Sequence, residues 1–168
     1  GFGEVTEVAR DLMKEKIEKL KARGRINVPI RSMIVGIPNV GKSTFINKYV
    51  GKVTAKTGDK PGVTRGKQWI KLKKDFELLD TPGIHKPQQQ LGRVLNKNAY
   101  SAMEDCDVLA WIVDGNENYG AGDTFILERI QALHKPVILL INKIDQMNKE
   151  KLMEVCLNWS KVYDFDEI

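Results

Sequence analysis

The sequence has little of what marks a secreted, membrane-spanning or metal-binding protein. Its two cysteines, Cys106 and Cys156, follow no metal-ligand spacing and form no plausible disulfide framework. No apolar stretch approaches the roughly 20 residues of a membrane-spanning helix, and no basic, apolar leader opens the chain. These absences predict free thiols in a reducing cytoplasm and no membrane span. We expect a monomer.

Charge is divided unevenly along a chain of otherwise ordinary composition. The 168 residues are 42% hydrophobic and 29% charged, which suits one globular domain. Residues 1–74 hold 18 Lys and Arg against 6 Asp and Glu, whereas residues 75–168 hold 9 against 16. Such asymmetry indicates a polyanion such as RNA on the basic side. A nucleotide phosphate and a solvated basic helix would account for the same lysines, so both interpretations stay open.

Hydrophobic periodicity predicts helices and strands in alternation. In residues 6–23, apolar side chains recur every three or four positions, which indicates an amphipathic helix. Residues 137–141 form a near-continuous apolar run, typical of a parallel strand covered on both faces. The other strands are expected at 31–35, 68–72, 76–79 and 108–113, and the other helices at 42–50, 91–103, 123–133 and 149–162. This order predicts an α/β fold with a doubly wound, mostly parallel sheet and helices on both faces.

The strongest motif is GIPNVGKS at residues 36–43, between an expected strand and an expected helix. In that context GxxxxGKS is a phosphate-binding loop, because its backbone N–H groups and the helix N-terminus point at the anion. Lys42 would reach the outer phosphates, and the Ser43 hydroxyl would ligate Mg²⁺. The residues expected to bind a nucleoside phosphate are Asn39, Val40, Gly41, Lys42, Ser43 and Thr44.

A second motif, DTPG, follows the expected strand at 76–79 and adds to the magnesium site. Asp80 at the strand tip would hold Mg²⁺ through water beside Ser43. Gly83 would leave its N–H free for a terminal phosphate, and Thr64 would supply a hydroxyl to Mg²⁺ when a γ-phosphate is present. This arrangement predicts an order–disorder switch that responds to the γ-phosphate.

The sequence NKID at residues 142–145 follows the last apolar strand and indicates the base. A carboxylate at Asp145 would accept from guanine N1–H and N2–H₂ together, whereas adenine would leave it unpaired. Asn142 and Lys143 complete the motif. Because the three motifs occur in the order and spacing of one site, the sequence predicts GTP or GDP as the ligand.

These motifs give the chain a resemblance to the translation-factor class of GTPases. Residues 1–83, with VARDLMK, GIPNVGKS and KTGDKPGVT, resemble the YlqF/RbgA ribosome-assembly GTPases. Residues 84–168, with IHKP, VDG and a closing YDFDEI, resemble Era. The resemblance implies a three-layer P-loop GTPase fold and GTP hydrolysis in ribosome assembly. It also implies ribosomal RNA or a ribosomal subunit as the partner.

The resemblance also bears on catalysis, because Ile84 occupies the position where many GTPases carry a water-orienting Gln. Relatives with an apolar residue there use a P-loop Asn to help bind K⁺, which gives Asn39 that role. His85 is an alternative, as a proton partner. We expect slow hydrolysis that is faster in K⁺ than in Na⁺. The expected catalytic residues are Lys42, Thr64, Gly83 and Asn39.

The order of the parts departs from both families. YlqF-type proteins are circularly permuted, and Era-type proteins begin at the P-loop strand, whereas here a basic amphipathic helix at 1–24 precedes that strand. No SAK-like base-contacting loop occurs. We expect one GTPase domain over 1–168 without a KH or other C-terminal RNA-binding domain, as a permutant, splice or chimera whose termini flank a displaced loop. The alternatives are a nucleotide-binding scaffold with negligible hydrolysis and an RNA-binding module.

Overall fold

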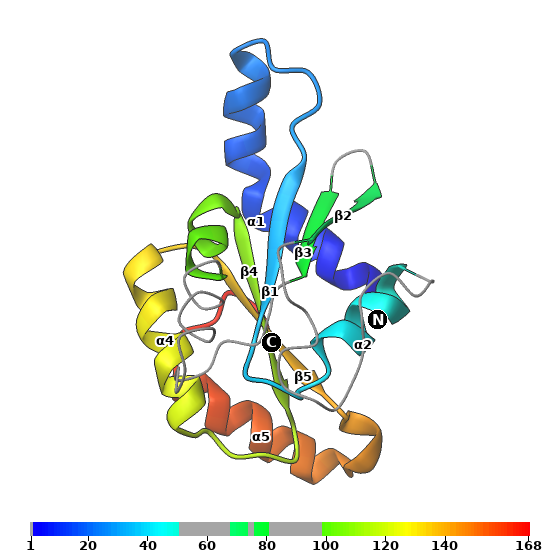
Figure 1. Cartoon of the computed structure of the whole chain (residues 1–168), viewed down its shortest axis with the longest axis vertical. Helices are drawn as coiled ribbons and strands as arrows, with labels where there is room; N and C mark the ends of the chain where they lie inside the picture. The colour runs from blue at the N-terminus through cyan, green and yellow to red at the C-terminus, as the bar shows by residue number, and fades with distance from the viewer. Residues whose placement is uncertain (1, 51–67, 74–75, 81–98) are drawn as a thin grey trace.

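The computed structural model describes residues 2–50, 68–73, 76–80 and 99–168. A five-stranded sheet in the order β2-β3-β1-β4-β5 lies between helices (Figure 1). Its strands are β1 (Ile30–Val35), β2 (Gln68–Lys73), β3 (Phe76–Asp80), β4 (Val108–Asp114) and β5 (Val137–Asn142). The helices are α1 (Phe2–Ala22), α2 (Lys42–Val50), α4 (Ala121–Leu133), α5 (Lys149–Ser160) and the short 3-10 helix η1 (Ile144–Gln146). Residues 99–105 are also helical.

Four of the strands are parallel, as the alternating pattern predicted. β1 pairs in parallel with β3 and with β4, and β4 pairs in parallel with β5. β2 is antiparallel to β3, which confirms the hairpin expected from their sequences. Because parallel strands point the same way, the segments that follow β1 and β5 begin at the same end of the sheet, with β4 between them. Those segments carry the GxxxxGKS and NKID motifs.

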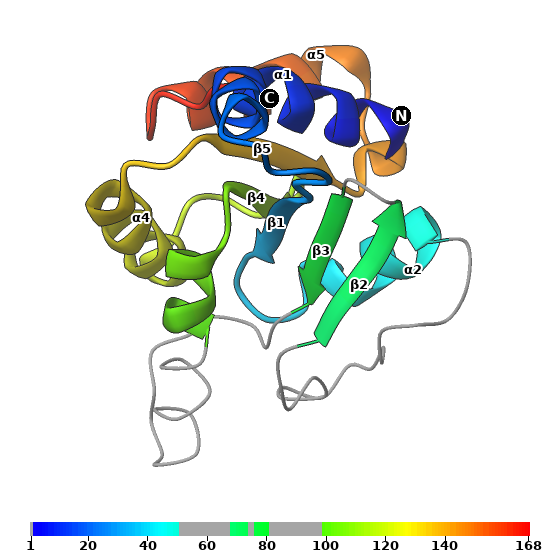
Figure 2. The same ribbon diagram turned by 90° about the horizontal axis from the view of Figure 1, so that it is seen from above.

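β4 is buried along its whole length and divides the interior into two cores. Trp111 lies in the core formed with α4, α5 and residues 99–105. Its neighbour Ile112 lies in the core on the other face, with residues of α1 and α2. Figure 2 shows α2 and α4 on opposite sides of the strands. The alternation of side chains along a strand therefore produces the three layers that the sequence predicted.

The predicted N-terminal helix is present and packs on the sheet through one stripe. It begins at Phe2, four residues before the expected start at Thr6. Thr6, Ala9 and Met13 are buried, at three- and four-residue spacing. The end of the helix extends past the sheet (Figure 1), and most side chains after Met13 are exposed.

Several element ends differ from the prediction for local reasons. α4 begins at Ala121 instead of Asp123, because the Asp123 carboxylate accepts from the Gly120 N–H at 3.1 Å and so belongs to the first turn. α5 ends at Ser160 instead of Val162. The helix expected at 91–103 extends to residue 105, and residues 91–98 lie outside the described part of the chain. η1 was not predicted, and neither was the parallel bridge between Ile138 and Glu167.

Cys106 is a packing residue in the structure, as its sequence context suggested. Its Sγ donates to the Met103 carbonyl at 3.2 Å, and burial raises the pKa of its thiol to about 12. Cys156 is only partly buried, and both thiols are free. Among the residues described, no helix is long and apolar enough to cross a membrane.

Candidate functional site

Residues 36–41 form a tight loop between β1 and α2, and its two glycines lie too close to neighbouring atoms to carry a Cβ. Gly41 has a φ of +93°, and a Cβ there would lie against Asn142 Nδ2. A Cβ on Gly36 would lie 2.6 Å from the Ile112 carbonyl oxygen. Asn39 also has a positive φ, of 68°, which Asn tolerates better than most residues. The glycines of the motif are therefore required by close approach of the backbone to its neighbours.

Lys42 begins α2 and turns back over the loop. Its side chain is buried, and Nζ donates to the carbonyls of Gly36 at 3.2 Å and Ile37 at 2.6 Å. No acidic residue lies in the first turn of α2, so the positive end of the helix dipole is not offset there. Ser43 is half-buried and Thr44 is exposed in the same turn. A cation, a hydroxyl and a helix N-terminus thus converge where the motif predicted an anion site.

Asn142 brings the NKID segment against the phosphate-binding loop. It is the last residue of β5, and its Nδ2 donates to the Val40 carbonyl at 2.9 Å, across 102 positions of sequence. The Asn142 amide fits here because residue 41 is glycine, since a Cβ at that position would collide with Asn142 Nδ2. This hydrogen bond joins the GxxxxGKS and NKID motifs into one site. The sequence alone predicted only that both motifs lie at the same end of the sheet.

Lys143 makes a sharp turn that directs the chain into η1. Its φ of 62° places it in the left-handed region, and its Nζ forms an ion pair with Asp114 Oδ2 at 2.6 Å. Burial opposes ionisation of Asp114, but hydrogen bonds from Lys143 and Asn116 prevail and lower the pKa of the Asp114 carboxyl. The same contact raises the pKa of Lys143. Asp145, in η1, is exposed.

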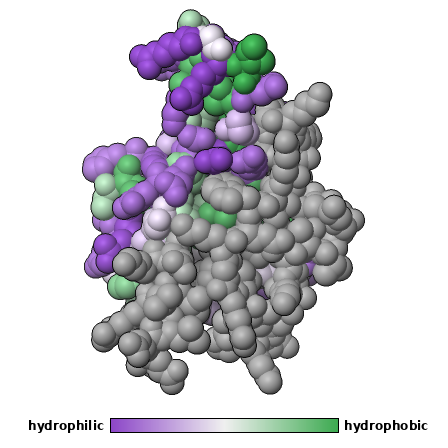
Figure 3. Space-filling view, turned by 45° about the horizontal axis from the view of Figure 1, so that its top comes forward, coloured by the Kyte–Doolittle hydropathy of each residue, from purple (hydrophilic) through white to green (hydrophobic). Residues whose placement is uncertain are grey.

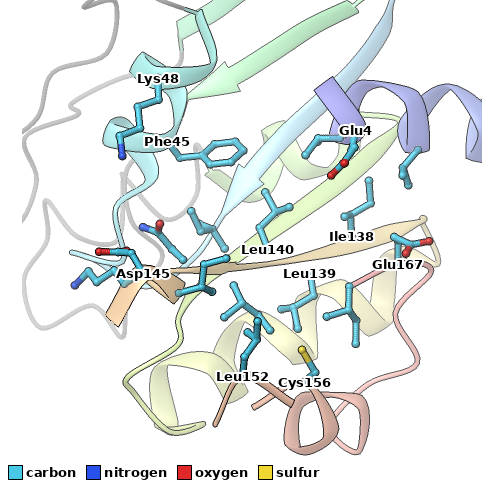
Figure 4. A pocket seen from close by; sticks show the side chains of 18 of the residues that line it. Glu4, Phe45, Lys48, Ile138, Leu139, Leu140, Asp145, Leu152, Cys156 and Glu167 are labelled. Atoms are coloured by element: carbon cyan, nitrogen blue, oxygen red, sulfur yellow. The ribbon is translucent and has the colours of Figure 1, made fainter. Parts of the chain in front are cut away.

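A cavity of about 950 Å³ joins the two segments. Thr44 and Phe45 of α2 line it together with Lys143 and Asp145. β5 runs across the cavity, with Phe45 on one side and Leu152 of α5 on the other (Figure 4). Its volume lies within the usual range for small-molecule sites, roughly 300–1,000 Å³.

The structure describes most of the predicted site residues but not the switch. Asn142, Lys143 and Asp145 lie beside the six predicted phosphate-binding residues from Asn39 to Thr44, which span the end of the loop and the first turn of α2. Asp80 is the last residue of β3, and its side chain is not described. Thr64, Gly83, Ile84 and His85 lie outside the described residues, so their roles stay predictions.

The sequence predicted no role for Asp114, which ends a strand outside the three motifs. In the structure Asp114 is buried, 5% exposed, and pairs with the lysine of NKID. The signal available in the sequence was weak: a carboxylate at the carboxyl end of a fully apolar strand, where α/β folds form ligand sites.

The fold and the joined loops define a P-loop nucleotide-binding domain. The sequence profile of the family described as 50S ribosome-binding GTPase matches residues 31–143. The chain belongs to that GTPase family.

Individual relatives indicate the Era type. The chain is 46% identical over 126 residues to GTPase Era of Alkaliphilus metalliredigens, covering 73% of this chain and 43% of that protein. It is 41% identical over 138 residues to GTPase Era of Alkaliphilus oremlandii, covering 80% and 47%. The chain thus spans less than half the length of these curated relatives.

Solved Era structures share the fold. A complex of Era with MgGDPNP and a 16S ribosomal RNA fragment is 31% identical, with a TM-score of 0.75, over 86% of this chain and 50% of that chain. An Era variant from Aquifex aeolicus bound to GDP and AlF4⁻ gives 31% identity and a TM-score of 0.75, over 85% and 50%.

The comparisons do not support the YlqF/RbgA resemblance or the permuted or chimeric origin. In the structure, Glu4 of α1 and Glu167 near the other end line the same cavity (Figure 4).

Replacing Gly41 by Ala is expected to destabilise the domain more than replacing Gly24. Both glycines have positive φ, +93° and +81°, so both variants carry a backbone cost of about 1–2 kcal/mol. Only Gly41 faces a neighbouring atom, because the space around Gly24 is open. We expect an additional loss of about 1–3 kcal/mol at Gly41, measured by urea unfolding.

An Asn142→Ala background provides the control. There the clash is removed, and Gly41→Ala should cost no more than Gly24→Ala. Equal losses for the two glycine variants in the parent protein would show that Asn142 does not pack against the loop.

Proposed function

We propose that this domain binds GTP and GDP with Mg²⁺ and hydrolyses GTP slowly, as the GTPase domain of an Era-type ribosome-assembly factor. The observation that carries the proposal is the hydrogen bond from Asn142 Nδ2 to the Val40 carbonyl, at 2.9 Å. It sets a base-selective segment beside a phosphate-binding loop, at a spacing fixed by the sheet.

The phosphate end of the nucleotide would lie over the loop at 36–41 and the first turn of α2. Without a ligand, the Lys42 ammonium group is satisfied by the carbonyls of Gly36 and Ile37. A phosphate oxygen is a stronger acceptor for an ammonium group, because the hydrogen bond is then assisted by charge on both sides. Lys42 would therefore turn outward to the β- and γ-phosphates when nucleotide binds.

The base would be read by Asp145, which lines the cavity beside Lys143. Its carboxylate has two acceptor oxygens for the two adjacent donors on the guanine edge. Adenine offers no such donor pair there, so binding it would leave the carboxylate without partners.

Mg²⁺ fits the donor set of the site. The described residues contain no cluster of three or more His, Cys, Asp or Glu that could hold a metal by themselves. Mg²⁺ commonly uses one or two protein oxygens together with substrate phosphates, and Ser43 offers a half-buried hydroxyl at the phosphate end. β3, which ends at Asp80, runs parallel to β1 and so brings that residue to the same edge. Ser43, Asp80 and Thr64 would hold the ion, which would neutralise charge on the phosphates.

Hydrolysis would depend on positioning and charge more than on a general base. Lys42 would stabilise charge on the phosphate, with Gly83 and Thr64 completing its surroundings. Asn39, at the exposed turn of the loop, would help to hold K⁺ near the phosphates. The ion would supply the positive charge that an arginine finger gives in other GTPases.

A ribosomal RNA contact would use the projecting part of α1. Residues 14–25, at the end of α1 and just after it, hold six Lys and Arg against two Glu. Figure 3 shows hydrophilic side chains on this end of the molecule, together with hydrophobic ones. The similar Era structure is a complex with 16S ribosomal RNA. One of these lysines already has an acidic partner in the protein, because Lys16 Nζ pairs with Asp107 Oδ1 at 2.7 Å. We infer that the protein is a monomer and acts in the cytoplasm.

Nucleotide titration followed by phosphate release tests the proposal. With Mg²⁺ present, fluorescent GDP and GTP should bind at least about 100-fold more tightly than ATP, because a polar site rejects a base that leaves it unpaired. Phosphate release from GTP should be slow and faster in K⁺ than in Na⁺. Equal rates in the two salts would exclude Asn39 from the mechanism, and binding without release would favour a non-hydrolysing scaffold.

An Asp145→Asn variant is the matched control for the base. Its amide N–H₂ would face the guanine N2–H₂, so GDP binding should fall, whereas xanthosine diphosphate, with an oxygen at that position, should bind better than to the parent. Unchanged preference for GDP would place the base elsewhere.

The RNA contact predicts a charge-dependent loss on one surface only. Lys19→Glu with Lys21→Glu, both on the projecting part of α1, should weaken binding to a 16S ribosomal RNA fragment. The slope of log affinity against log salt should fall by about two, since each phosphate contact contributes about 0.9. The control, Lys149→Glu with Lys161→Glu, makes the same charge change on exposed positions at the ends of α5. If both double variants lose the same affinity for the RNA fragment, the loss reflects net charge and not a contact made by α1.

A further inference from the structure

We propose that Asp114 is a positioning residue for guanine recognition, holding Lys143 and through it the turn that presents Asp145. The inference rests on the proposed function, in which Asp145 reads the base. Asp114 ends β4 and lies outside the NKID motif in sequence, and neither carboxylate oxygen needs to touch the nucleotide for this role.

Asp114 connects to both ends of η1. Its Oδ2 pairs with Lys143 Nζ at 2.6 Å, at the residue that precedes the helix. Its Oδ1 accepts from the Asn116 N–H at 3.0 Å and from Asn116 Nδ2 at 3.3 Å. Asn116 Nδ2 also donates to Gln146 Oε1 at 3.0 Å, at the last residue of η1. Asp145 lies between these two attachment points.

The backbone supports the same alignment. Asp114 is opposite Asn142 in the register of β4 and β5, and the Gly115 N–H donates to the Asn142 carbonyl at 3.0 Å. A Cβ on Gly115 would collide with Met147, the residue that follows η1. The end of β4 is thus packed directly against the NKID turn.

The chemistry of the contact requires a carboxylate. Asp114 is 5% exposed, and its two oxygens serve three donors from Lys143 and Asn116. An amide in its place would turn an N–H₂ group toward the Lys143 ammonium or toward the donors of Asn116. Lys143 holds a φ of 62°, a conformation that is strained for a non-glycine residue and persists only where its surroundings maintain it.

The test compares GDP with ADP in the full chain with Mg²⁺. Asp114→Asn should lower GDP affinity about tenfold, the value of one hydrogen bond to a charged group, and leave ADP affinity within about twofold. ADP uses the phosphate loop but not Asp145, so a general structural defect would weaken both nucleotides. Glu117→Gln is the matched control, because it removes one exposed negative charge from the same loop, and it should change neither affinity.

A double-mutant cycle tests whether Asp114 acts through the lysine. In a Lys143→Met background, Asp114→Asn should change GDP affinity by less than about twofold. A full tenfold loss in that background, or equal losses for GDP and ADP in the single variant, would overturn the proposal.

Hydrogen exchange without nucleotide separates this inference from the proposed function. The Gln146 and Met147 amides donate to the carbonyls of Lys143 and Ile144, at 3.2 and 3.1 Å. Asp114→Asn should speed their exchange about tenfold, because it removes one hydrogen bond to a charged group. Glu117→Gln should leave their exchange unchanged. If the parent protein shows no preference for GDP over ADP, the proposed function is wrong, but the exchange rates still test whether Asp114 holds the turn. If the exchange rates of the Gln146 and Met147 amides do not change in Asp114→Asn, the positioning role of Asp114 is wrong even if the protein binds GDP.

Discussion

The hydrogen bond between the Asn142 side chain and the Val40 carbonyl is the contact on which the site depends. It spans 102 positions and joins the end of β5 to the loop that follows β1. Its geometry leaves no room for a Cβ on Gly41. The phosphate-binding loop and the base-reading turn are therefore held together by a hydrogen bond to which each motif contributes one partner.

The sheet makes this contact possible by placing β4 between β1 and β5. β4 is buried throughout, and its alternating residues pack into a core on each face. Close packing of this kind resists displacement of one strand relative to the next. The carboxyl ends of β1 and β5 are thereby fixed relative to each other, and Asp114, at the end of β4, lies close enough to pair with Lys143.

Much of this architecture could be predicted because its signals are local. The order of strands and helices follows from periodicity, and GxxxxGKS and NKID encode backbone geometry within a few residues. The ion pair of Asp114 with Lys143 could not be predicted, since its partners are far apart in sequence and a single Asp after a strand is usually a turn residue. The early start of α4 arises from a side-chain bond of Asp123 that periodicity does not register. Thr64 and Gly83 stay predictions from motif alone.

A crystal structure of the domain with GDP and Mg²⁺ tests the proposed site most directly. We expect guanine N1 and N2 about 3 Å from the Asp145 carboxylate, with the Asn142 to Val40 hydrogen bond intact. We also expect Lys42 Nζ to have left the Gly36 and Ile37 carbonyls for the β-phosphate. A base bound away from Asp145, or phosphates bound away from the first turn of α2, would contradict the assignment of these two motifs to one guanine-nucleotide site.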